Sequence, residues 1–215
     1  MKINYGSDYY DNRRRSPAFQ SEIQNIIKLI NPLENDLILE IGCGGGVLLE
    51  ELSKFQCDLV VGSDWLITAT KLSSSKLDIP IISCDARKLP FRKNRFTKII
   101  AQHLIEHFSD PVTVLKEWSR VLTDNGRIVL VTPNLGYPYQ DWFEDPTHFK
   151  IYTSEELSRI VCLAGFNVES IQIINPFLFH WRFQSLANKK FQFLNNVSFL
   201  SKHGMSIVIL ASKIN

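Results

Sequence analysis

Histidines and acids gather at two places where this chain could carry out proton transfer. His103, Glu106 and His107 directly follow an apolar segment that ends at Gln102, and His148 lies in the later segment WFEDPTHFKIY. A histidine titrates near neutral pH, so it can remove a proton from a hydroxyl or ammonium group as a general base. We therefore take His148, His107 and Glu106 as candidate catalytic residues.

Both candidate histidines, His107 and His148, also have a structural interpretation. His107 could cap the helix that is predicted to follow it, and His148 could bond to backbone while Asp145 caps a turn. No metal is predicted, because no pair of His or Cys residues has ligand spacing. Four residues that are close in sequence could form an accidental cluster, namely Asp141, Glu144, Asp145 and His148.

A second chemical feature is the crowding of glycines after the apolar run LILEI. Four of the ten glycines, Gly42, Gly44, Gly45 and Gly46, occupy neighbouring positions there. Glycine lets the backbone turn sharply and approach a ligand closely, and the helix that follows offers unpaired N–H groups. A plain tight turn needs only one glycine. The pattern therefore predicts a loop that binds a nucleotide-like cofactor.

The residues around this loop narrow the choice of cofactor. The dinucleotide pattern Gly-x-Gly-x-x-Gly fails at its third place, which is Val47. Glu40 lies just before the glycines, where its charge disfavours a pyrophosphate but suits a cationic cofactor. Asp64, 22 residues after Gly42, can take both hydroxyls of a ribose, and Asp85 can accept a hydrogen bond from an exocyclic amine such as that of adenine.

A sheet must bring these residues together. Short apolar runs predict strands over 37–41, 59–62, 79–83, 98–102, 127–132, 167–174 and 205–211. Amphipathic stretches predict helices over 17–31, 46–55, 65–74, 111–122 and 154–164. Strands that alternate with helices indicate an α/β fold with a mostly parallel sheet, in which the ends of the strands share one rim.

Composition limits the other functions open to the chain. A length of 215 residues suits a single domain, 1–215, and a net charge of +2 is too small to favour nucleic acid as a partner. The absence of a signal sequence, of a long apolar span and of any Cys-x-x-Cys pair suggests a cytoplasmic protein with free thiols. A basic run is interpreted as a solvated face: Arg87, Lys88, Arg92, Lys93, Arg95 and Lys98.

In combination, these motifs resemble the class I S-adenosylmethionine-dependent methyltransferases, in the small-molecule branch that includes ubiquinone-pathway enzymes. The resemblance covers roughly residues 37–166 and rests on Glu40-Ile41-Gly42-Cys43-Gly44, on HLIEH at 103–107 and on LTDNGRIVLVTP at 122–133. It implies S-adenosylmethionine as the cofactor. It also implies a Rossmann-like, doubly wound sheet of seven strands, mostly parallel, with the last strand inserted antiparallel between its neighbours.

The resemblance assigns further residues to the cofactor. The ribose-binding acid of the family falls on Asp64, its adenine-contacting pair on Asp85 and Ala86, and Trp65 lies near the adenine. The predicted cofactor-binding residues are Glu40, Gly42, Cys43, Gly44, Asp64, Trp65, Asp85, Ala86 and Gln102. In relatives the N-terminal region folds over the cofactor, so residues 1–31 are predicted to form a helical lid. Either one of Arg13, Arg14 and Arg15 binds the methionine carboxylate, or the three form a surface charge run.

We therefore predict a methyltransferase that methylates an oxygen of a small molecule or of a glycan or lipid precursor. The segment DPTH resembles that of polysaccharide-pathway methyltransferases. N- or C-methylation, a purely regulatory cofactor-binding protein and an NAD-dependent dehydrogenase stay open as alternatives. Residues 175–204 form an aromatic-rich insertion. It could pack on its own domain or in a homodimer, roof the acceptor pocket, or contact a membrane surface.

Overall fold

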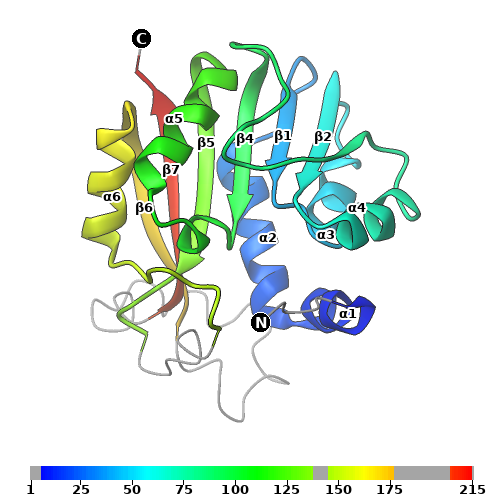
Figure 1. The fold of residues 1–215 in the computed structure, drawn as a ribbon, viewed down its shortest axis with the longest axis horizontal. Helices are drawn as coiled ribbons and strands as arrows, with labels where there is room; N and C mark the ends of the chain where they lie inside the picture. Colours follow the sequence, from blue (N-terminus) through cyan, green and yellow to red (C-terminus); the bar gives the residue numbers. More distant parts are fainter. Residues whose placement is uncertain (1–5, 138–144, 177–203, 215) are drawn as a thin grey trace.

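One seven-stranded sheet organises the computed structural model, which describes residues 6–137, 145–176 and 204–214. The strands are β1 Leu37–Ile41, β2 Leu59–Asp64, β3 Ile81–Ser83, β4 Phe96–Gln102, β5 Leu122–Pro133, β6 Phe166–Pro176 and β7 Gly204–Lys213. The helices are α1 Ser7–Arg15, α2 Pro17–Ile30, α3 Val47–Leu52, α4 Ile67–Ser74, the 3-10 helix η1 Ile105–His107, α5 Pro111–Val121 and α6 Ser154–Leu163. Figure 1 shows α5 and α6 in front of the sheet and α2 behind it.

The strand order β3-β2-β1-β4-β5-β7-β6 confirms the predicted topology. The first five strands in this order pair in parallel, and β7 pairs antiparallel with both β5 and β6. The carboxyl ends of the parallel strands consequently meet at one rim, which is the lower edge of the sheet in Figure 1 and the side on which α1 lies. Ligands of open α/β sheets bind at this rim.

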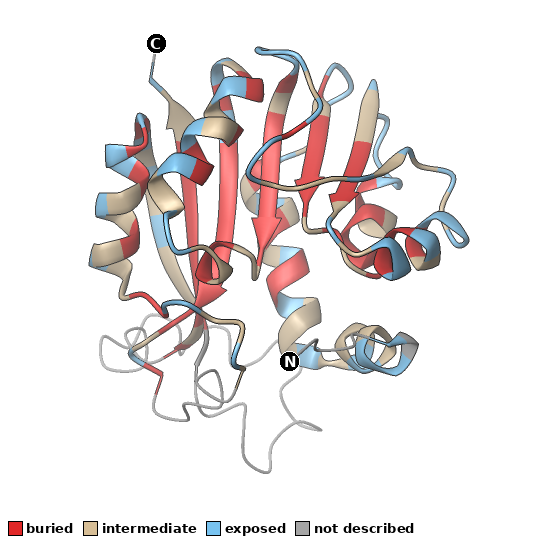
Figure 2. Ribbon diagram, viewed as in Figure 1, coloured by how far each residue is buried: buried red, intermediate tan, exposed pale blue. Residues whose placement is uncertain are grey.

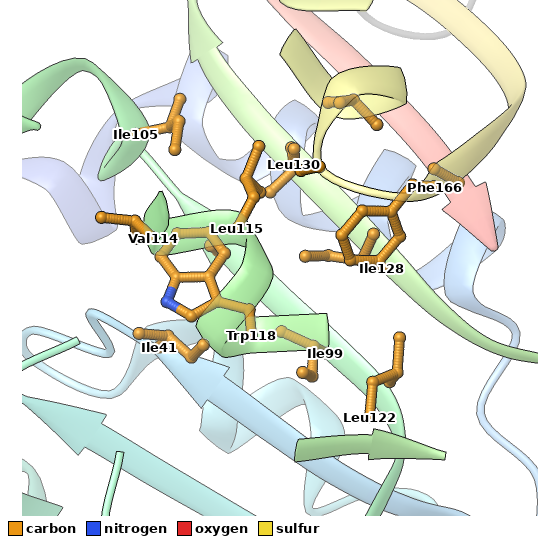
Figure 3. Close-up of a cluster of buried hydrophobic side chains, with 14 of the residues drawn as sticks. Ile41, Ile99, Ile105, Val114, Leu115, Trp118, Leu122, Ile128, Leu130 and Phe166 are labelled. Carbon is orange, nitrogen blue, oxygen red and sulfur yellow. The ribbon is translucent and has the colours of Figure 1, made fainter. Parts of the chain in front are cut away.

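Side chains alternate between the two faces of the sheet, and both faces are covered. On β1, Leu39 and Ile41 belong to the core beneath α5 and α6, whereas Ile38 packs with the isoleucines of α2. Figure 2 shows the central strands buried along most of their length. Figure 3 shows Trp118 of α5 at the centre of the first core, beside Val114 and Ile41. Strands that are buried on both faces read as continuous apolar runs, which is why the sequence predicts them well.

Local signals in the sequence fix where several helices begin. Ser16 accepts a hydrogen bond from the Phe19 N–H (3.4 Å), and Pro17 occupies the first turn of α2. A capping box begins α6, with Thr153 and Glu156 each bonding to the other's backbone N–H. Because Ser16 caps α2, the N-terminal region forms two helices joined there.

Two predictions at the strands need correction. The third strand is shorter than 79–83, because Pro80 has no N–H to donate; only its carbonyl joins the sheet, accepting from Gly62 N at 2.9 Å. Lys98 does not belong to a solvated face: it is 7% exposed and forms an ion pair with buried Asp36. The alternation of β4 places its side chain inward, and a partner makes this burial tolerable.

The predictions of a homodimer contact and of a membrane contact both concern residues 175–204. Most of the aromatic-rich insertion 175–204 lies outside the described residues, so homodimer and membrane contacts stay predictions. In the described part of the chain, no helix is both long enough and apolar enough to cross a membrane.

Candidate functional site

The glycine loop joins β1 to α3 in a conformation that most side chains would oppose. Gly42 and Gly44 have φ angles of +77° and +50°, in the left-handed region that favours glycine. The N–H groups of Gly42 and Cys43 donate to the Ser63 carbonyl at 2.7 and 2.9 Å, which ties the loop to the end of β2. A Cβ at Gly44 would lie 2.9 Å from the ring of Tyr10. These hydrogen bonds hold the loop in place. Because Gly44 has no side chain, the ring of Tyr10 can pack directly against the loop.

A pocket of about 560 Å³ opens above this loop at the carboxyl rim. Among the described residues, its wall contains most of the predicted site, namely Glu40, Gly42, Cys43, Gly44, Asp64, Trp65, Gln102, Glu106, His107 and His148. It also contains residues outside the predicted set, namely Tyr9, Tyr10, Arg13, Phe19, Gly45, Val47, Leu48, Leu66, His103, Leu104, Pro133, Asp145 and Thr147. Most of the predicted cofactor-binding residues and all three candidate catalytic residues therefore border one space.

Asp64 ends β2 at this rim, as predicted. Its carboxylate accepts hydrogen bonds from the N–H groups of Gly44 and Leu66, both at 2.8 Å. Burial raises the pKa of Asp64 above its ordinary value, and the bonds from Leu66, Gly44 and Trp65 only partly offset this. The carboxylate both orders the glycine loop and faces the pocket.

Glu40 is a buried acid with one unsatisfied oxygen. Its side chain is 3% exposed, and its Oε2 atom has no hydrogen-bond partner among the described residues. Burial, followed by the charge of Asp64, raises the pKa of Glu40 well above its ordinary value. A cation bound in the pocket would reverse this effect, so the site is better suited to a positively charged ligand than to a pyrophosphate.

Asp85 and Ala86 do not line the pocket, unlike the other predicted residues. Arg87 donates to both oxygens of Asp85, with Nη2 at 2.7 Å and Nε at 3.0 Å, and its hydrogen bonds lower the pKa of that acid. The Ala86 carbonyl accepts a bond from the Trp118 indole N–H at 2.9 Å. Their assignment to adenine stays a prediction.

Glu106 of η1 reaches the pocket from a fully buried position. Its Oε2 atom accepts a hydrogen bond from the Thr132 hydroxyl at 3.0 Å, whereas Oε1 has no hydrogen-bond partner among the described residues. The backbone carbonyl of Glu106 accepts from Phe149 N at 2.8 Å. This bond anchors the segment that carries His148 against η1.

The two candidate catalytic histidines come together. The ring centroids of His107 and His148 are 4.7 Å apart. His107 Nδ1 lies 3.2 Å from the Thr147 carbonyl and 3.1 Å from the Thr147 hydroxyl. That hydroxyl donates to Asp145 Oδ1 at 2.5 Å, so both oxygens accept from His107. The hydrogen of a neutral His107 is therefore assigned to Nδ1, which leaves the lone pair on Nε2.

Of the two predicted capping roles, that of His107 is wrong and that of Asp145 is confirmed. His107 does not cap the next helix, because Asp110 does so by accepting from Thr113 N at 3.1 Å. Asp145 does cap a turn, accepting from Thr147 N at 2.9 Å, while its Oδ2 lies 3.8 Å from His148 Nε2. The turn thus positions His148 beside His107.

Glu106, His107 and His148 could also hold a metal ion. Each offers one ligand atom, and these atoms lie within 4.8 Å of one another. Histidine nitrogens with a carboxylate oxygen are a common donor set for zinc and similar divalent ions. Spacing along the sequence could not reveal this group, because His148 is 41 residues beyond His107 and only the fold unites them. The prediction of no metal stays untested.

The N-terminal helices supply residues that sequence reasoning missed or left open. A Cβ at Gly45 would lie 2.8 Å from Tyr10 Cβ, so Tyr10 covers the glycine loop. Arg13 borders the pocket, with its guanidinium 4.3 Å from the centre of the Phe19 ring, whereas Arg14 pairs with Glu50 at the surface. The one available signal was the adjacent pair of tyrosines before a run of arginines.

Comparisons with known proteins agree with this geometry. The family model described as a methyltransferase domain matches residues 12–171. The ubiquinone biosynthesis O-methyltransferase of Arabidopsis thaliana mitochondria is 29% identical over 70% of this chain, which spans only 53% of that protein. The ubiquinone biosynthesis O-methyltransferase of Azorhizobium caulinodans is 25% identical over 81% of this chain and 77% of its own length.

A solved structure shows the same fold. A Haloferax volcanii methyltransferase in complex with the Trm112 methyltransferase activator aligns with a TM-score of 0.78, covering 98% of this chain and 96% of its own. The sequence identity of that pair is 14%, so this likeness concerns the fold alone.

Proposed function

This chain belongs to the family of S-adenosylmethionine-dependent methyltransferases, and from that premise we propose that it methylates a hydroxyl oxygen of a small molecule or of a glycan or lipid precursor. One observation carries the proposal: a single pocket contains the glycine loop together with Glu106, His107 and His148. The cofactor loop and a candidate base thus face the same space. The relatives from ubiquinone biosynthesis are named O-methyltransferases, which supports oxygen as the accepting atom.

We assign the cofactor to the side of the pocket formed by β1 and β2. Asp64 would bind the ribose hydroxyls, and the glycine loop would let the cofactor approach the backbone closely. The acids Glu40 and Asp64 make this side suitable for a ligand that carries a positive sulfonium. Gln102 and Cys43 border the same space.

We assign the acceptor to the side formed by η1 and the segment 145–149. The methyl group of a sulfonium is already activated, so much of the rate comes from placing the acceptor oxygen in line with the breaking C–S bond. As the O–C bond forms, the hydroxyl proton must leave. Nε2 of His107 can take it, because Nδ1 is occupied by Thr147. General base catalysis of this kind contributes roughly 10²–10⁴-fold.

The grouping of Glu106, His107 and His148 favours a second candidate, in which these three side chains hold a divalent cation. His107 fits such a role, because metal-bound histidines usually donate their other N–H to a carbonyl or a carboxylate. Such an ion would lower the pKa of a hydroxyl bound to it. Residues Glu106, His107 and His148 would be its ligands.

The proposed function is tested with purified protein, S-adenosylmethionine labelled in its methyl group, and fractions of a cell extract. We expect label to enter a small molecule, to be stable to conditions that remove methyl esters and to be bonded to oxygen in the mass spectrum of the product. Label found on nitrogen or carbon, or cofactor binding without transfer in any fraction, would contradict it.

The metal candidate is tested without an acceptor. Calorimetric titration with Zn²⁺ or Mn²⁺ alone should show binding that His148→Ala weakens, while the exposed Cys162→Ser leaves it unchanged. Equal binding to the protein and to His148→Ala would reject these ligands.

A further inference from the structure

Glu22 is an acid buried on the apolar face of α2. Its residue exposure is only 4%, and its side chain reaches the ends of β4 and β7. Isolated charges are not tolerated in such places unless they are paired or fully hydrogen-bonded. One feature of the sequence indicates that Glu22 is buried. It lies four residues before Ile26, so both side chains are on the same face of the helix.

Three polar side chains satisfy this carboxylate. Gln102 Nε2 donates to Oε2 at 2.7 Å, His103 Nε2 lies 2.9 Å from the same oxygen, and the Ser206 hydroxyl donates to Oε1. The partners come from the pocket end of β4 and from β7. Glu22 itself does not border the pocket, but Gln102 and His103 do.

His103 is held between two acids. While Nε2 faces Glu22, Nδ1 lies 3.6 Å from Glu106 Oε1, the oxygen that has no hydrogen-bond partner. The φ of His103 is +52°, which is uncommon for a residue other than glycine and persists only where the surroundings determine it. Its backbone N–H donates to the Val131 carbonyl at 2.8 Å. Arg13 of α1 is the other charge that acts on this group.

We propose that Glu22 is a positioning residue for methyl transfer, because it holds His103 against Glu106. Through this contact, helix α2 forms part of the floor of the active site. The inference rests on the proposed function, in which Glu106 belongs to the acceptor side. Both ring nitrogens of His103 face carboxylates, so the role of proton acceptor is left to His107 and His148.

Glu22→Gln is the informative variant, because it removes the charge and keeps the shape. The amide oxygen can still accept from Gln102 and His103, and the Ser206 hydroxyl can accept from the new amide N–H. The variant is therefore expected to fold. Glu50→Gln is the matched control: Glu50 also binds the N-terminal helices, through Arg14, and it does not border the pocket.

Methyl transfer is compared at saturating S-adenosylmethionine, using the extract fraction that supports transfer in the parent protein. We expect Glu22→Gln to lower the maximal rate by about tenfold or more, because a misplaced catalytic group costs rate and not cofactor affinity. Its dissociation constant for S-adenosylmethionine should stay within about threefold, and Glu22→Asp should recover part of the rate. Glu50→Gln should match the parent in both quantities. A parental rate in folded Glu22→Gln would overturn the proposal.

A second readout needs no acceptor. In ¹H–¹⁵N spectra of histidine side chains, the Nε2–H of His103, assigned by its loss in His103→Gln, should appear far downfield because it donates to a carboxylate. Glu22→Gln should move this signal upfield, and Glu50→Gln should not. An unmoved signal would reject the contact itself. A moved signal in a protein that methylates no hydroxyl would instead reject the proposed function and leave the His103 contact standing.

Discussion

The two rims of the sheet differ in how fully they satisfy the oxygens of buried acids. At the amino rim, Lys98 donates to Asp36 and to the Asn31 carbonyl, while the other Asp36 oxygen accepts from Thr97 at 2.8 Å. At the carboxyl rim, Glu40 Oε2 and Glu106 Oε1 have no hydrogen-bond partner among the described residues. Buried polar atoms normally find partners, so unsatisfied ones require a specific explanation.

This difference separates a structural ion pair from a binding site. The amino rim satisfies both oxygens of Asp36 within the protein. The carboxyl rim combines acids that have unsatisfied oxygens with a left-handed His103, and both features cost stability. Such costs persist at functional sites, where a ligand or a reaction offsets them. Substitutions at the amino rim should therefore change stability, and those at the carboxyl rim should change binding or rate.

The largest effect is expected at the amino rim. Lys98→Ala leaves Asp36 buried without its partner, which should lower the free energy of unfolding by about 3–5 kcal/mol. Urea denaturation measures this, with exposed Lys93→Ala as the control, expected to change stability by less than about 0.5 kcal/mol. Where Lys98→Ala still folds, its affinity for S-adenosylmethionine should be unchanged. Lost affinity in the folded variant would break the division between the rims.

His148→Ala tests the acceptor side of the carboxyl rim. Because His148 packs against His107 on the proposed acceptor side, turnover should fall by about 10²-fold while cofactor affinity stays nearly intact. Steady-state kinetics with the acceptor and calorimetry with S-adenosylmethionine separate the two quantities. The reverse pattern, with affinity lost and turnover kept, would move His148 to the cofactor side.

Asp64→Ala tests the cofactor side of the same rim. Loss of a charge-assisted hydrogen bond to the ribose costs about 1.5–3 kcal/mol, so the dissociation constant for S-adenosylmethionine should rise about 10- to 150-fold. Asp58→Ala is a close control, because Asp58 is exposed just before the other end of β2. Equal affinities in the two variants would remove Asp64 from the site.

The smallest effect is a pH dependence of cofactor binding. Burial raises the pKa values of Glu40 and Asp64, so the free protein retains protons that an unburied acid would release. A cationic ligand favours the ionised acids, so binding should release protons and affinity should fall as the pH drops through the raised pKa values. The limit is about tenfold per pH unit for each proton. Calorimetry over a pH series measures the slope, and Glu40→Gln should flatten it.

The sequence alone predicts the cofactor half of the site better than the acceptor half. The glycine loop and Asp64 follow strands that are continuous apolar runs, so their place at one rim follows from the α/β pattern. The contact of His107 with His148 depends on how the segment after β5 folds back on η1, which no local pattern encodes. Glu22 and Lys98 were missed because each is a charge on a buried face, where an unseen partner overrides the usual preference for solvent. The pairing of Asp85 with Arg87 was missed for a related reason. The Arg87 side chain, two residues away, donates to the Asp85 carboxylate that was predicted to accept from adenine.

The central claim, that the carboxyl rim is the S-adenosylmethionine site, is tested most directly by calorimetric titration of the cofactor into Gly44→Val and Gly165→Val. Both substitutions place a side chain on a left-handed backbone, with φ of +50° and +91°, but only Gly44 borders the pocket; a Cβ at Gly165 would meet nothing within 4 Å. The two variants thus share the backbone strain, but only Gly44→Val places a side chain in the pocket. We predict one cofactor bound per chain in the parent protein and in folded Gly165→Val, with no measurable binding in folded Gly44→Val. Parental affinity in Gly44→Val would contradict the account.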